Sequence, residues 1–310
     1  MRLAVTGATG FLGRHLIPEA LAAGHTIKAL VRPGKELEPR AGLEVVRGDL
    51  SSREVLQRLV EGAEVVIHLA AVGVQARNRQ WQQMVQANVE QPLVLAEVTA
   101  EAGATRLVAV GTCLEYRGQG TLPASRGRPG SLCEEHDPLE ADEPYGAAKA
   151  AGGLLIRSRS RSLGLPCWYL RYAAIYGRGD DEKKVLPAAA RAARQQLGFE
   201  MTAGEQVREW LHLDDAVAAL LAAAVTPPAQ DGAAINVGTG EAHVLRDVVA
   251  RIFELAGAPA SLIHAGAYPY RAAEAHRLVM STALARELLP AWRPRVQLDQ
   301  GLTDLLALGG

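Results

Sequence analysis

The chain has 310 residues, 48% of them hydrophobic and 22% charged, and its 33 basic residues nearly balance its 34 acidic ones. Such a chain is long enough to bury a core in one large domain or two coupled ones, and its charge gives no sign of a nucleic-acid or membrane partner. Cys113, Cys133 and Cys167 lack close pairing and indicate neither disulfides nor a metal centre, so we expect a cytoplasmic protein without a bound metal.

The first half of the chain alternates short apolar runs with helical patterns. They predict strands at Leu3–Val5, Thr26–Val31, Leu43–Val46, Glu64–Leu69 and Arg106–Val110, and helices at Phe11–Ala23, Ser51–Leu59 and Gln82–Ala102. Most strand residues are apolar, as in a parallel sheet that is covered on both faces. The first strand begins almost at Met1, so no secretory signal is expected.

The second half is less regular. The segment Arg117–Glu143 is rich in Gly, Pro, Ser and charge, and we interpret this long loop as a mobile rim of the active site. The patterns beyond it predict helices at Tyr145–Ser160, Asp214–Val225 and Leu245–Ala256, strands at Cys167–Leu170 and Ala233–Val237, and an irregular, partly helical stretch at Arg178–Arg208. The longest apolar run, Ala216–Val225, is too short to span a bilayer.

These elements predict an α/β fold, a doubly wound parallel sheet of the Rossmann type with a smaller C-terminal substrate-binding lobe. We assign residues 1–177 to the nucleotide-binding domain, with residues 210–238 returning to it, and residues 178–209 and 239–310 to the substrate lobe. Ligands of open α/β sheets bind beyond the carboxyl ends of the strands. Residues at those ends are therefore the candidates for chemistry.

A glycine-rich turn, Gly7-Ala8-Thr9-Gly10-Phe11-Leu12-Gly13, joins the first predicted strand to the first helix. In a βαβ unit the first glycine permits the tight turn, the second lets a pyrophosphate approach the backbone, and the third lets helix and strand pack closely. Free N–H groups and the helix dipole then face the phosphates. Three spaced glycines are weak evidence alone, but in this context they predict a dinucleotide site.

The end of the second predicted strand, Val31-Arg32, bears on which dinucleotide binds. Proteins that prefer NAD usually carry an acid there for the ribose 2′-hydroxyl, whereas an arginine suits the 2′-phosphate of NADP. Arg32 therefore favours NADP(H). NAD(H) is the alternative if Arg32 only faces solvent at the end of a strand.

Tyr145 and Lys149 lie four residues apart, which places a phenol and an ammonium on one face of a helix. A free phenol titrates near pH ~10, and a neighbouring cation lowers its pKa toward the range useful for acid–base catalysis. Thr112 ends the fifth strand and is placed to hydrogen-bond a substrate oxygen beside Tyr145. Taken singly, these residues could be a helix-start tyrosine with a surface lysine and a threonine that caps a strand.

In combination, these motifs resemble the extended short-chain dehydrogenase/reductase family, also called the NAD-dependent epimerase/dehydratase family, from Met1 to Leu245. The matching stretches are Thr6–Gly13, Gly48–Leu50, His68–Ala71, Asn88–Val89, Gly111–Thr112 with Tyr116, Tyr145–Lys149, Ile175–Gly177, Val207–Asp215 and Asn236–Gly238. Each stretch is short, but so many in the right order are specific.

The resemblance implies that Thr112, Tyr145 and Lys149 are catalytic, with Tyr145 as general acid or base and Lys149 also holding the nicotinamide ribose. Asp49 would contact the adenine and Arg208 a substrate phosphate. The implied cofactor contacts are Gly7, Thr9, Gly10, Phe11, Leu12, Gly13, Arg32, Asp49, Leu50, Leu69, Ala70, Ala71, Asn88, Tyr145, Lys149, Ala174 and Ile175. The implied substrate contacts are Val72, Thr112, Cys113, Leu114, Tyr145, Ala174 and Arg208.

Departures from the family pattern narrow the expected reaction. Sugar-nucleotide dehydratases follow the catalytic threonine with Asp-Glu, where this chain has Cys113-Leu114, so dehydration is not expected. Four-epimerases usually carry an acid after the second strand, where this chain has Arg32. The stretch Gly111–Tyr116 looks most like deoxysugar-nucleotide ketoreductases, although Ala174 replaces an asparagine that contacts the substrate pyrophosphate in many members.

The sequence therefore predicts an NADPH-dependent ketoreductase of a nucleotide-linked 4-keto-6-deoxysugar, with Tyr145 as the proton donor. An NAD-dependent sugar-nucleotide 4-epimerase, a reductase of a non-sugar ketone or aldehyde, and a non-enzymatic NADP-binding regulator stay open. The regulator is disfavoured because a sensor needs none of the three catalytic residues. The resemblance also implies a homodimer, formed through the helices Gln82–Ala102 and Tyr145–Ser160.

Overall fold

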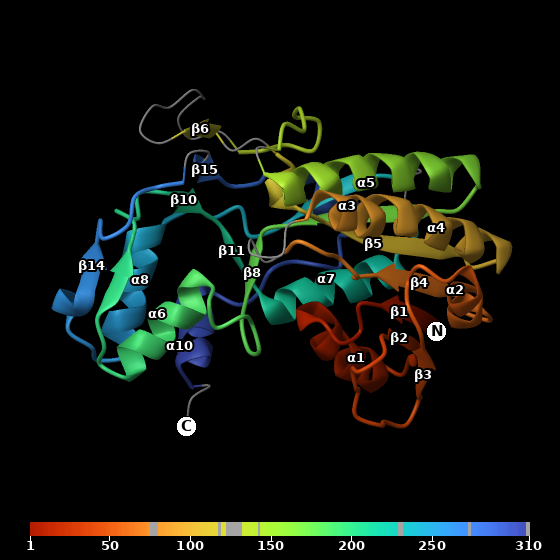
Figure 1. Cartoon of the computed structure of the whole chain (residues 1–310), viewed down its shortest axis with the longest axis horizontal. Helices are drawn as coiled ribbons and strands as arrows, with labels where there is room; N and C mark the ends of the chain where they lie inside the picture. Colours follow the sequence, from red (N-terminus) through yellow and green to blue (C-terminus); the bar gives the residue numbers. More distant parts are fainter. Residues whose placement is uncertain are drawn as a thin grey trace.

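The computed structural model describes residues 1–74, 80–116, 119–121, 132–141, 143–228, 232–271 and 274–307 (Figure 1). Its largest feature is a seven-stranded sheet in the order β12-β7-β5-β4-β1-β2-β3, with every neighbouring pair parallel. The strands are β1 (Arg2–Thr6), β2 (Thr26–Val31), β3 (Leu43–Arg47), β4 (Val65–His68), β5 (Arg106–Thr112), β7 (Cys167–Tyr172) and β12 (Ala234–Val237). The predicted Rossmann-type α/β sheet is confirmed.

Helices cover both faces of this sheet (Figure 1). One face packs against α1 (Phe11–Ala22) and α7 (Leu213–Val225), and the other against α2 (Arg53–Val60), α4 (Gln91–Glu101) and α5 (Pro144–Ser162). A separate apolar core lies on each side, one around Leu16 and Leu220 and the other around Leu56 and Leu95. Burial on both faces explains why most strand residues are apolar.

The helix predicted at Gln82–Ala102 has three parts. A short helix, α3 (Trp81–Val85), leads into a π-helical turn, Gln86–Glu90, and then into α4. The turn carries Asn88, whose carbonyl oxygen lies so close to α5 that a Cβ at Gly152 would collide with it. A π-helical turn shifts the helical register locally without a clear mark in the apolar pattern, so the sequence predicted one regular helix.

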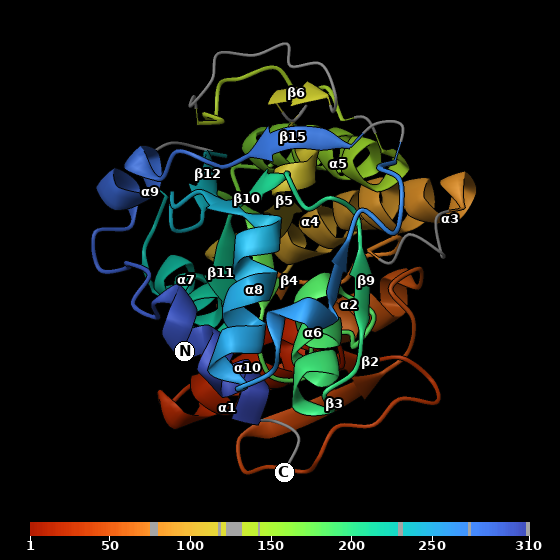
Figure 2. The same cartoon turned by 90° about the vertical axis from the view of Figure 1, so that its left-hand side faces the viewer.

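The second lobe is built from short elements (Figure 2). Its four-stranded sheet, in the order β13-β10-β15-β6, contains β6 (Gln119–Thr121), β10 (Val207–Arg208), β13 (His243–Val244) and β15 (Ala275–Leu278). Two-stranded sheets pair β8 (Ala174–Tyr176) with β11 (Trp210–His212), and β9 (Phe199–Met201) with β14 (Ile263–Ala265). The helices are α6 (Val185–Arg194), α8 (Leu245–Leu255), α9 (Ala283–Leu288) and α10 (Leu298–Ala307), and α6, α8 and α10 share a third apolar core.

Residues 210–238 return to the main domain in part. The strand β12 pairs with β7 at the sheet edge, and α7 packs against α1. The strand β11 pairs with β8 in a separate two-stranded sheet, and the assignment of residues 210–238 to the nucleotide-binding domain stays a prediction. Most of the predicted loop Arg117–Glu143 lies outside the described residues; its described strand β6 pairs with β15 of the second lobe. None of the described helices is long and apolar enough to cross a membrane.

Candidate active site

The glycine-rich turn lies where β1 meets α1. Gly7 has a φ of +71°, and a Cβ there would come within 2.6 Å of the Ala70 backbone nitrogen. A Cβ at Gly13 would collide with the carbonyl oxygen of Gly7. Only glycine fits such approaches. Because α1 follows Gly10 without a side-chain cap from any described residue, its first N–H groups can face a phosphate, so the turn fits a dinucleotide pyrophosphate.

The end of β4 is held against β1 through a buried histidine. Thr6 Oγ1 lies 2.7 Å from His68 Nδ1 and accepts a hydrogen bond of 3.4 Å from the Ala70 N–H. Burial, with a smaller effect of the Lys149 charge, lowers the pKa of His68 to about 3, so the imidazole is neutral near pH 7. The predicted contacts at Leu69–Val72 follow directly and are all half-buried.

Three predicted contacts for the adenosine half, Arg32, Asp49 and Leu50, follow the neighbouring strands β2 and β3. Ser51 donates hydrogen bonds of 2.9 Å and 2.7 Å from its N–H and hydroxyl to Asp49 Oδ1; these bonds lower the pKa of that carboxyl, with a smaller contribution from the charge on Arg32. Leu50 is buried. Arg32 is exposed and its guanidinium forms no hydrogen bond or ion pair with the described residues, so it can meet an anion.

Asn88, another predicted cofactor contact, is buried in the π-helical turn. Its Oδ1 accepts from the Val72 N–H at 3.0 Å, and its Nδ2 donates to the Val72 carbonyl at 2.8 Å. The amide thus fixes the backbone that follows β4. A direct contact between Asn88 and a cofactor stays a prediction.

The helix α5 places Tyr145 and Lys149 between the ends of β4 and β5. Buried Tyr145 packs with Met84 and Ala148, against Ala71 and Val72. Lys149 is buried and its Nζ donates to the Val110 carbonyl at 2.5 Å, two residues before Thr112. Burial lowers the pKa of Lys149, and the charge on Glu115 opposes that shift. Tyr145 and Lys149 therefore lie next to the ends of β4 and β5. Predicted cofactor and substrate contacts follow β4, and the predicted catalytic residue Thr112 ends β5.

Thr112 ends β5 and begins a 3₁₀ turn, Cys113–Glu115. Its Oγ1 accepts from the Leu114 N–H at 3.3 Å, while Glu115 Oε1 accepts from the Thr112 N–H at 2.9 Å. This reciprocal capping box fixes the end of the strand. A Cβ at Gly146 would collide with the Leu114 carbonyl, so the start of α5 lies directly against this turn and brings Tyr145 beside it.

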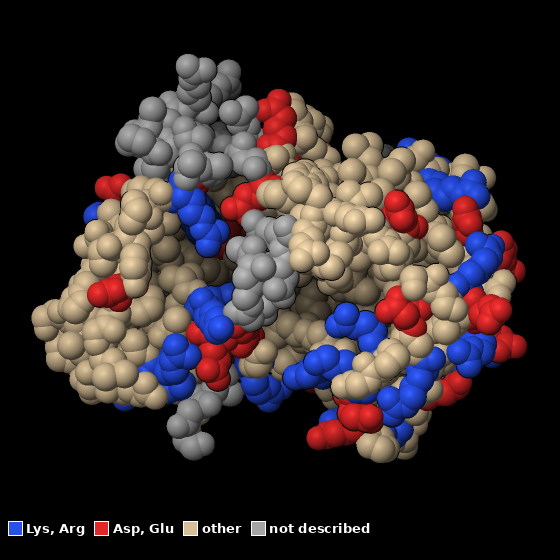
Figure 3. Space-filling view, viewed as in Figure 1, with Lys and Arg blue, Asp and Glu red and all other residues tan. Residues whose placement is uncertain are grey.

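The other predicted substrate contacts near this turn differ in character. Leu114 is exposed, and Cys113 is half-buried. Burial raises the pKa of the Cys113 thiol to about 12, so it stays protonated near pH 7 and cannot act as a base. Ala174 and Ile175 lie on β8, just beyond β7. Figure 3 shows a hollow between the two lobes with charged side chains at its rim.

Arg208, predicted to bind a substrate phosphate, already has partners on β10 and near β15. Its Nη2 forms an ion pair of 2.6 Å with Glu274 Oε1 and donates to the Ala275 carbonyl at 2.8 Å. Its Nη1 donates to the carbonyls of Val207 and His276 at 3.0 Å and 3.4 Å. These bonds use all four Nη hydrogens, so a phosphate that approaches the Nη atoms would have to displace or share them, whereas the fifth donor, Nε–H, takes part in none of these bonds. Glu274 is 66 positions away, and nothing in the sequence pointed to it.

The sequence analysis assigned no role to a buried polar group next to Thr112. Glu115 Oε2 accepts from Arg171 Nε at 2.9 Å, and the Tyr169 hydroxyl lies 2.8 Å from Glu115 Oε1. All three side chains are buried. The Thr-x-x-Glu spacing was a signal for the capping box. The strand around Arg171 reads as apolar, so nothing marked the arginine as the partner of Glu115.

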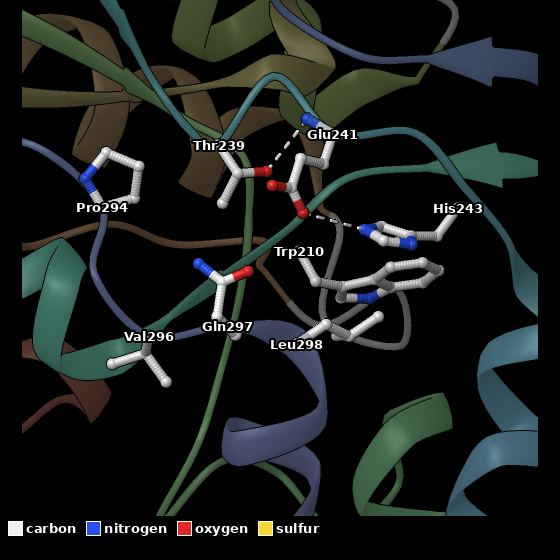
Figure 4. Close-up of a pocket in the computed structure, with 8 residues that line it drawn as sticks. All are labelled: Trp210, Thr239, Glu241, His243, Pro294, Val296, Gln297 and Leu298. Atoms are coloured by element: carbon white, nitrogen blue, oxygen red, sulfur yellow. Dashed lines mark hydrogen bonds and ion pairs between the residues drawn. The ribbon is translucent and has the colours of Figure 1, made fainter.

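A small polar pocket lies in the second lobe (Figure 4). Glu241 pairs with His243 at 3.6 Å, and the Thr239 hydroxyl accepts from the Glu241 N–H at 3.1 Å. The pocket is lined by Trp210, Thr239, Glu241, His243, Pro294, Val296, Gln297 and Leu298. It contains none of the predicted site residues. Within the described ranges, no three His, Cys, Asp or Glu side chains are grouped to hold a metal.

Comparison with known proteins gives consistent matches. Residues 3–238 match the family described as the NAD dependent epimerase/dehydratase family. A dTDP-6-deoxy-L-talose 4-dehydrogenase (NAD(P)(+)) of Kitasatospora kifunensis is 30% identical over 98% of this chain and 94% of its own length. A ceramide reductase of Caulobacter vibrioides is 33% identical over 73% of this chain and 61% of its own length. The UDP-glucose 4-epimerase of Thermus thermophilus, solved with NAD, has a TM-score of 0.84 at 26% identity and covers 99% of this chain and 98% of that one.

Proposed function

The chain belongs to the NAD-dependent epimerase/dehydratase family, and on this basis we propose that it is an NADPH-dependent ketoreductase of a nucleotide-linked 4-keto-6-deoxysugar. One observation carries the proposal. Tyr145 and Lys149 lie between the ends of β4 and β5, with Tyr145 beside the turn that begins at Thr112. This is the edge of the sheet where open α/β folds bind ligands.

In this proposal Tyr145, Thr112 and Lys149 have different roles in the reduction of a ketone. Tyr145 donates a proton to the carbonyl oxygen as it becomes an alkoxide, and Thr112 hydrogen-bonds the same oxygen. The buried cation of Lys149 lies on the same helix face as Tyr145 and favours its phenolate, which eases proton release. A reduced nicotinamide, when bound, supplies the hydride that the ketone carbon gains.

The residues at the turn and at β2 suit NADP(H). Gly7 and the start of α1 would hold the pyrophosphate, Asp49 the adenine, and Lys149 the nicotinamide ribose. The exposed guanidinium of Arg32, which forms no hydrogen bond or ion pair with the described residues, suits a 2′-phosphate. The name of the Kitasatospora relative allows either NAD or NADP, and the Thermus structure holds NAD.

The substrate proposal rests on the Kitasatospora relative and on the turn after Thr112. A 4-dehydrogenase of a 6-deoxysugar nucleotide catalyses, in reverse, the reduction of a 4-ketone. In this chain Cys113 and exposed Leu114 offer no acid–base pair for elimination, and burial keeps the thiol of Cys113 protonated. Reduction is therefore favoured over dehydration.

A second candidate is a reductase of a ketone that carries no pyrophosphate. The ion pair between Arg208 and Glu274 favours it, because the cation expected to meet a phosphate is already neutralised. One relative of this chain, from Caulobacter vibrioides, is named a ceramide reductase, and a ceramide carries no pyrophosphate. The two candidates share the cofactor and the catalytic residues. They differ in the substrate, because only the first has a pyrophosphate that would contact Arg208.

The testing experiment follows NADPH oxidation by its near-ultraviolet absorbance, with 4-keto-6-deoxysugar nucleotides and long-chain ketones as substrates and NADH in parallel. Oxidation of NADPH with the sugar nucleotides supports the proposal. Oxidation of NADPH with the long-chain ketones but not with the sugar nucleotides would support the second candidate instead. No oxidation with any ketone, together with NAD that stays bound through purification, would indicate the 4-epimerase.

The proposed role of Arg32 has its own test. Replacing Arg32 with Ala removes the cation from the end of β2, so we expect NADPH binding to weaken by about tenfold, on the order of one charge-assisted hydrogen bond. NADH binding should change little, and so should both affinities in the control Arg40→Ala, another exposed arginine. An equal loss for NADH and NADPH would contradict a 2′-phosphate contact.

The proposed substrate contact at Arg208 predicts an effect of Glu274→Gln. Removing the competing carboxylate should tighten the binding of dTDP several-fold, as measured by calorimetry, because the guanidinium no longer has to give up an ion pair. Glu200→Gln, which changes an exposed carboxylate elsewhere in the lobe, is the control. Unchanged dTDP affinity would show that the phosphates do not reach Arg208.

We also propose that the protein forms a homodimer through α3, α4 and α5. Exposed apolar side chains occur on two of these helices, Trp81 and Val85 on α3 and Leu154 and Leu155 on α5. The helices lie side by side on one flank of the molecule (Figure 1). Exposed apolar side chains on surface helices support the proposal, because contiguous apolar patches mark protein interfaces.

A further inference from the structure

The buried pair of Glu115 and Arg171 needs an explanation beyond stability. Glu115 is 0% exposed and Arg171 2%, and their closest atoms are 2.9 Å apart. Removing two charges from water costs about as much free energy as their attraction returns, and apolar residues of similar size often stabilise such a site equally well. A charged pair at this depth therefore suggests a role in positioning or electrostatics.

The carboxylate of Glu115 contacts the backbone of one predicted catalytic residue directly, and the Tyr169 hydroxyl lies between this carboxylate and the backbone of a second. Its Oε1 accepts from the Thr112 N–H at 2.9 Å. The Tyr169 hydroxyl lies 2.8 Å from the same oxygen and 2.9 Å from the carbonyl oxygen of Lys149. The phenol has one proton, which it gives to one of these two acceptors or shares between them, so its hydroxyl lies between the end of β5 and the turn of α5 that carries Lys149.

The surrounding backbone leaves room for this link. A Cβ at Gly111 would come within 2.5 Å of Glu115 Oε1 and 2.6 Å of Tyr169 Cε1. A Cβ at Gly153, on α5, would meet the Tyr169 hydroxyl at 2.5 Å. Both β5 and α5 therefore lack a side chain at the positions where the carboxylate and the phenol pass between them.

Arg171, the ion-pair partner of Glu115, is itself held by hydrogen bonds. Its Nη1 donates to the Tyr116 hydroxyl at 2.9 Å and to the Glu135 carbonyl at 3.2 Å. The Tyr116 hydroxyl in turn donates to Asn236 Oδ1 at 2.7 Å. These bonds hold the guanidinium in one place, and with it the carboxylate that it binds.

Glu115 also belongs to the electrostatic surroundings of Lys149. Burial lowers the pKa of Lys149, and the negative charge of Glu115 opposes this shift. The other titratable groups close to Lys149 are His68 on β4, Tyr145 on its own helix and Tyr169 on β7. His68 is neutral near pH 7, so Glu115 is the nearby anion that supports the cation.

We propose that Glu115, held by Arg171, is a positioning residue that sets Thr112 and Lys149 relative to each other through the Tyr169 hydroxyl. This inference rests on the proposed function, because it assumes that Thr112 and Lys149 act on substrate and cofactor. It assigns a role to three buried residues, Glu115, Tyr169 and Arg171, that are not among the predicted cofactor and substrate contacts.

The test compares two single-atom changes on β7. Tyr169→Phe removes the hydroxyl that links Glu115 to Lys149, while Tyr172→Phe removes a buried hydroxyl that bonds the Ala216 carbonyl at 2.9 Å, away from the site. We expect Tyr169→Phe to lower kcat about tenfold or more, since small misplacements of catalytic groups are costly, and to weaken NADPH binding several-fold. Tyr172→Phe should leave both quantities within about twofold, with a similar change in Tm.

Equal effects of the two variants on kcat and NADPH binding would overturn the proposal, because both lose one buried hydrogen bond. Glu115→Gln is the second variant. It keeps an acceptor for Thr112 but leaves Arg171 without its anion, so NADPH binding should weaken at least as much as in Tyr169→Phe. Wild-type protein that reduces no ketone would refute the proposed function alone, and NADPH titration of the same variants would still decide the positioning role.

Discussion

At the scale of single residues, the site depends on which polar groups are buried. Lys149 and His68 are both buried near the ends of β4 and β5, but among the described residues the charge of an anion, Glu115, acts on the pKa of the lysine, whereas burial and the Lys149 charge act on that of the histidine. Burial disfavours the charged form of any group, and a neighbouring opposite charge favours it. We therefore expect Lys149 to act on Tyr145 as a cation that Glu115 supports, while the neutral histidine holds Thr6 at the end of β1.

Replacing Tyr145 with Phe tests the proton donor. The variant keeps the ring that packs with Met84 and Ala148 but loses the hydroxyl, so kcat should fall by roughly two to four orders of magnitude, which is the usual contribution of a positioned acid. Stopped-flow measurement of NADPH oxidation gives the rate. An unchanged NADPH affinity in the same variant would show that the cofactor site is intact, and near-normal turnover would refute the assignment.

His68 predicts an acid-sensitive stability. Its pKa is lowered from 6.5 to about 3 in the folded chain, so below pH 6.5 the unfolded chain takes up a proton that the folded chain refuses. The free energy of unfolding should therefore fall as the pH drops from 6.5 toward 3. One pKa unit corresponds to about 1.4 kcal/mol, so the loss at pH 4.5 is roughly 2–3 kcal/mol.

Chemical denaturation between pH 7 and pH 4 measures this loss. His68→Gln removes the titrating group and should flatten the pH dependence over that range, whereas His136→Gln, at an exposed position, should not. Identical slopes for wild type and His68→Gln would mean that other groups cause the acid sensitivity.

At the scale of elements, the turn between β1 and α1 lets us separate two effects of replacing a glycine: backbone strain from a positive φ, and a collision of the new Cβ with neighbouring backbone. Gly7 and Gly24 both have positive φ, at +71° and +80°, but only at Gly7 would a Cβ meet the backbone of Ala70. Gly24→Ala should cost about 1 kcal/mol of stability and leave NADPH binding unchanged. Gly7→Ala should weaken NADPH binding by more than about tenfold, because the turn must move away from the phosphates. Thermal unfolding and NADPH titration separate the two, and normal NADPH binding by Gly7→Ala would contradict the pyrophosphate site.

Elements of different length were not equally predictable from sequence. The strands of the main sheet were found because most of their residues are apolar, and the helices α1, α2, α5, α7 and α8 were found from their longer helical patterns. The strands of the second lobe are two to four residues long and several include charged residues or histidine, as in Val207-Arg208 and His243-Val244, so they carry too little pattern to be recognised. The ion pair between Arg208 and Glu274 was missed for a related reason. It depends on the pairing of β10 with β15, and no local sequence pattern predicts that pairing.

At the scale of the whole molecule, the predicted site residues come from both lobes. The strand β5, which ends at the predicted catalytic residue Thr112, belongs to the main sheet, and the chain beyond it continues into β6, which pairs with β15 of the second lobe. The strand β15 also pairs with β10, which carries Arg208. The predicted catalytic residues thus belong to the main domain and the predicted phosphate contact to the second lobe.

The proposed dimer can be tested at the same scale, because α5 carries both exposed leucines and catalytic residues. Leu154 is 57% exposed on α5, and Leu197 is 54% exposed in the second lobe, so the two make a matched pair for substitution. A charge at the centre of an apolar interface has to be buried without a partner, so Leu154→Glu should give a monomer in light scattering coupled to gel filtration. Leu197→Glu should keep the dimer. If Leu154→Glu is monomeric, the opposite face of α5 loses the support of the partner subunit, and kcat should fall while the chain stays folded. A dimer that survives Leu154→Glu unchanged would place the interface elsewhere on the molecule.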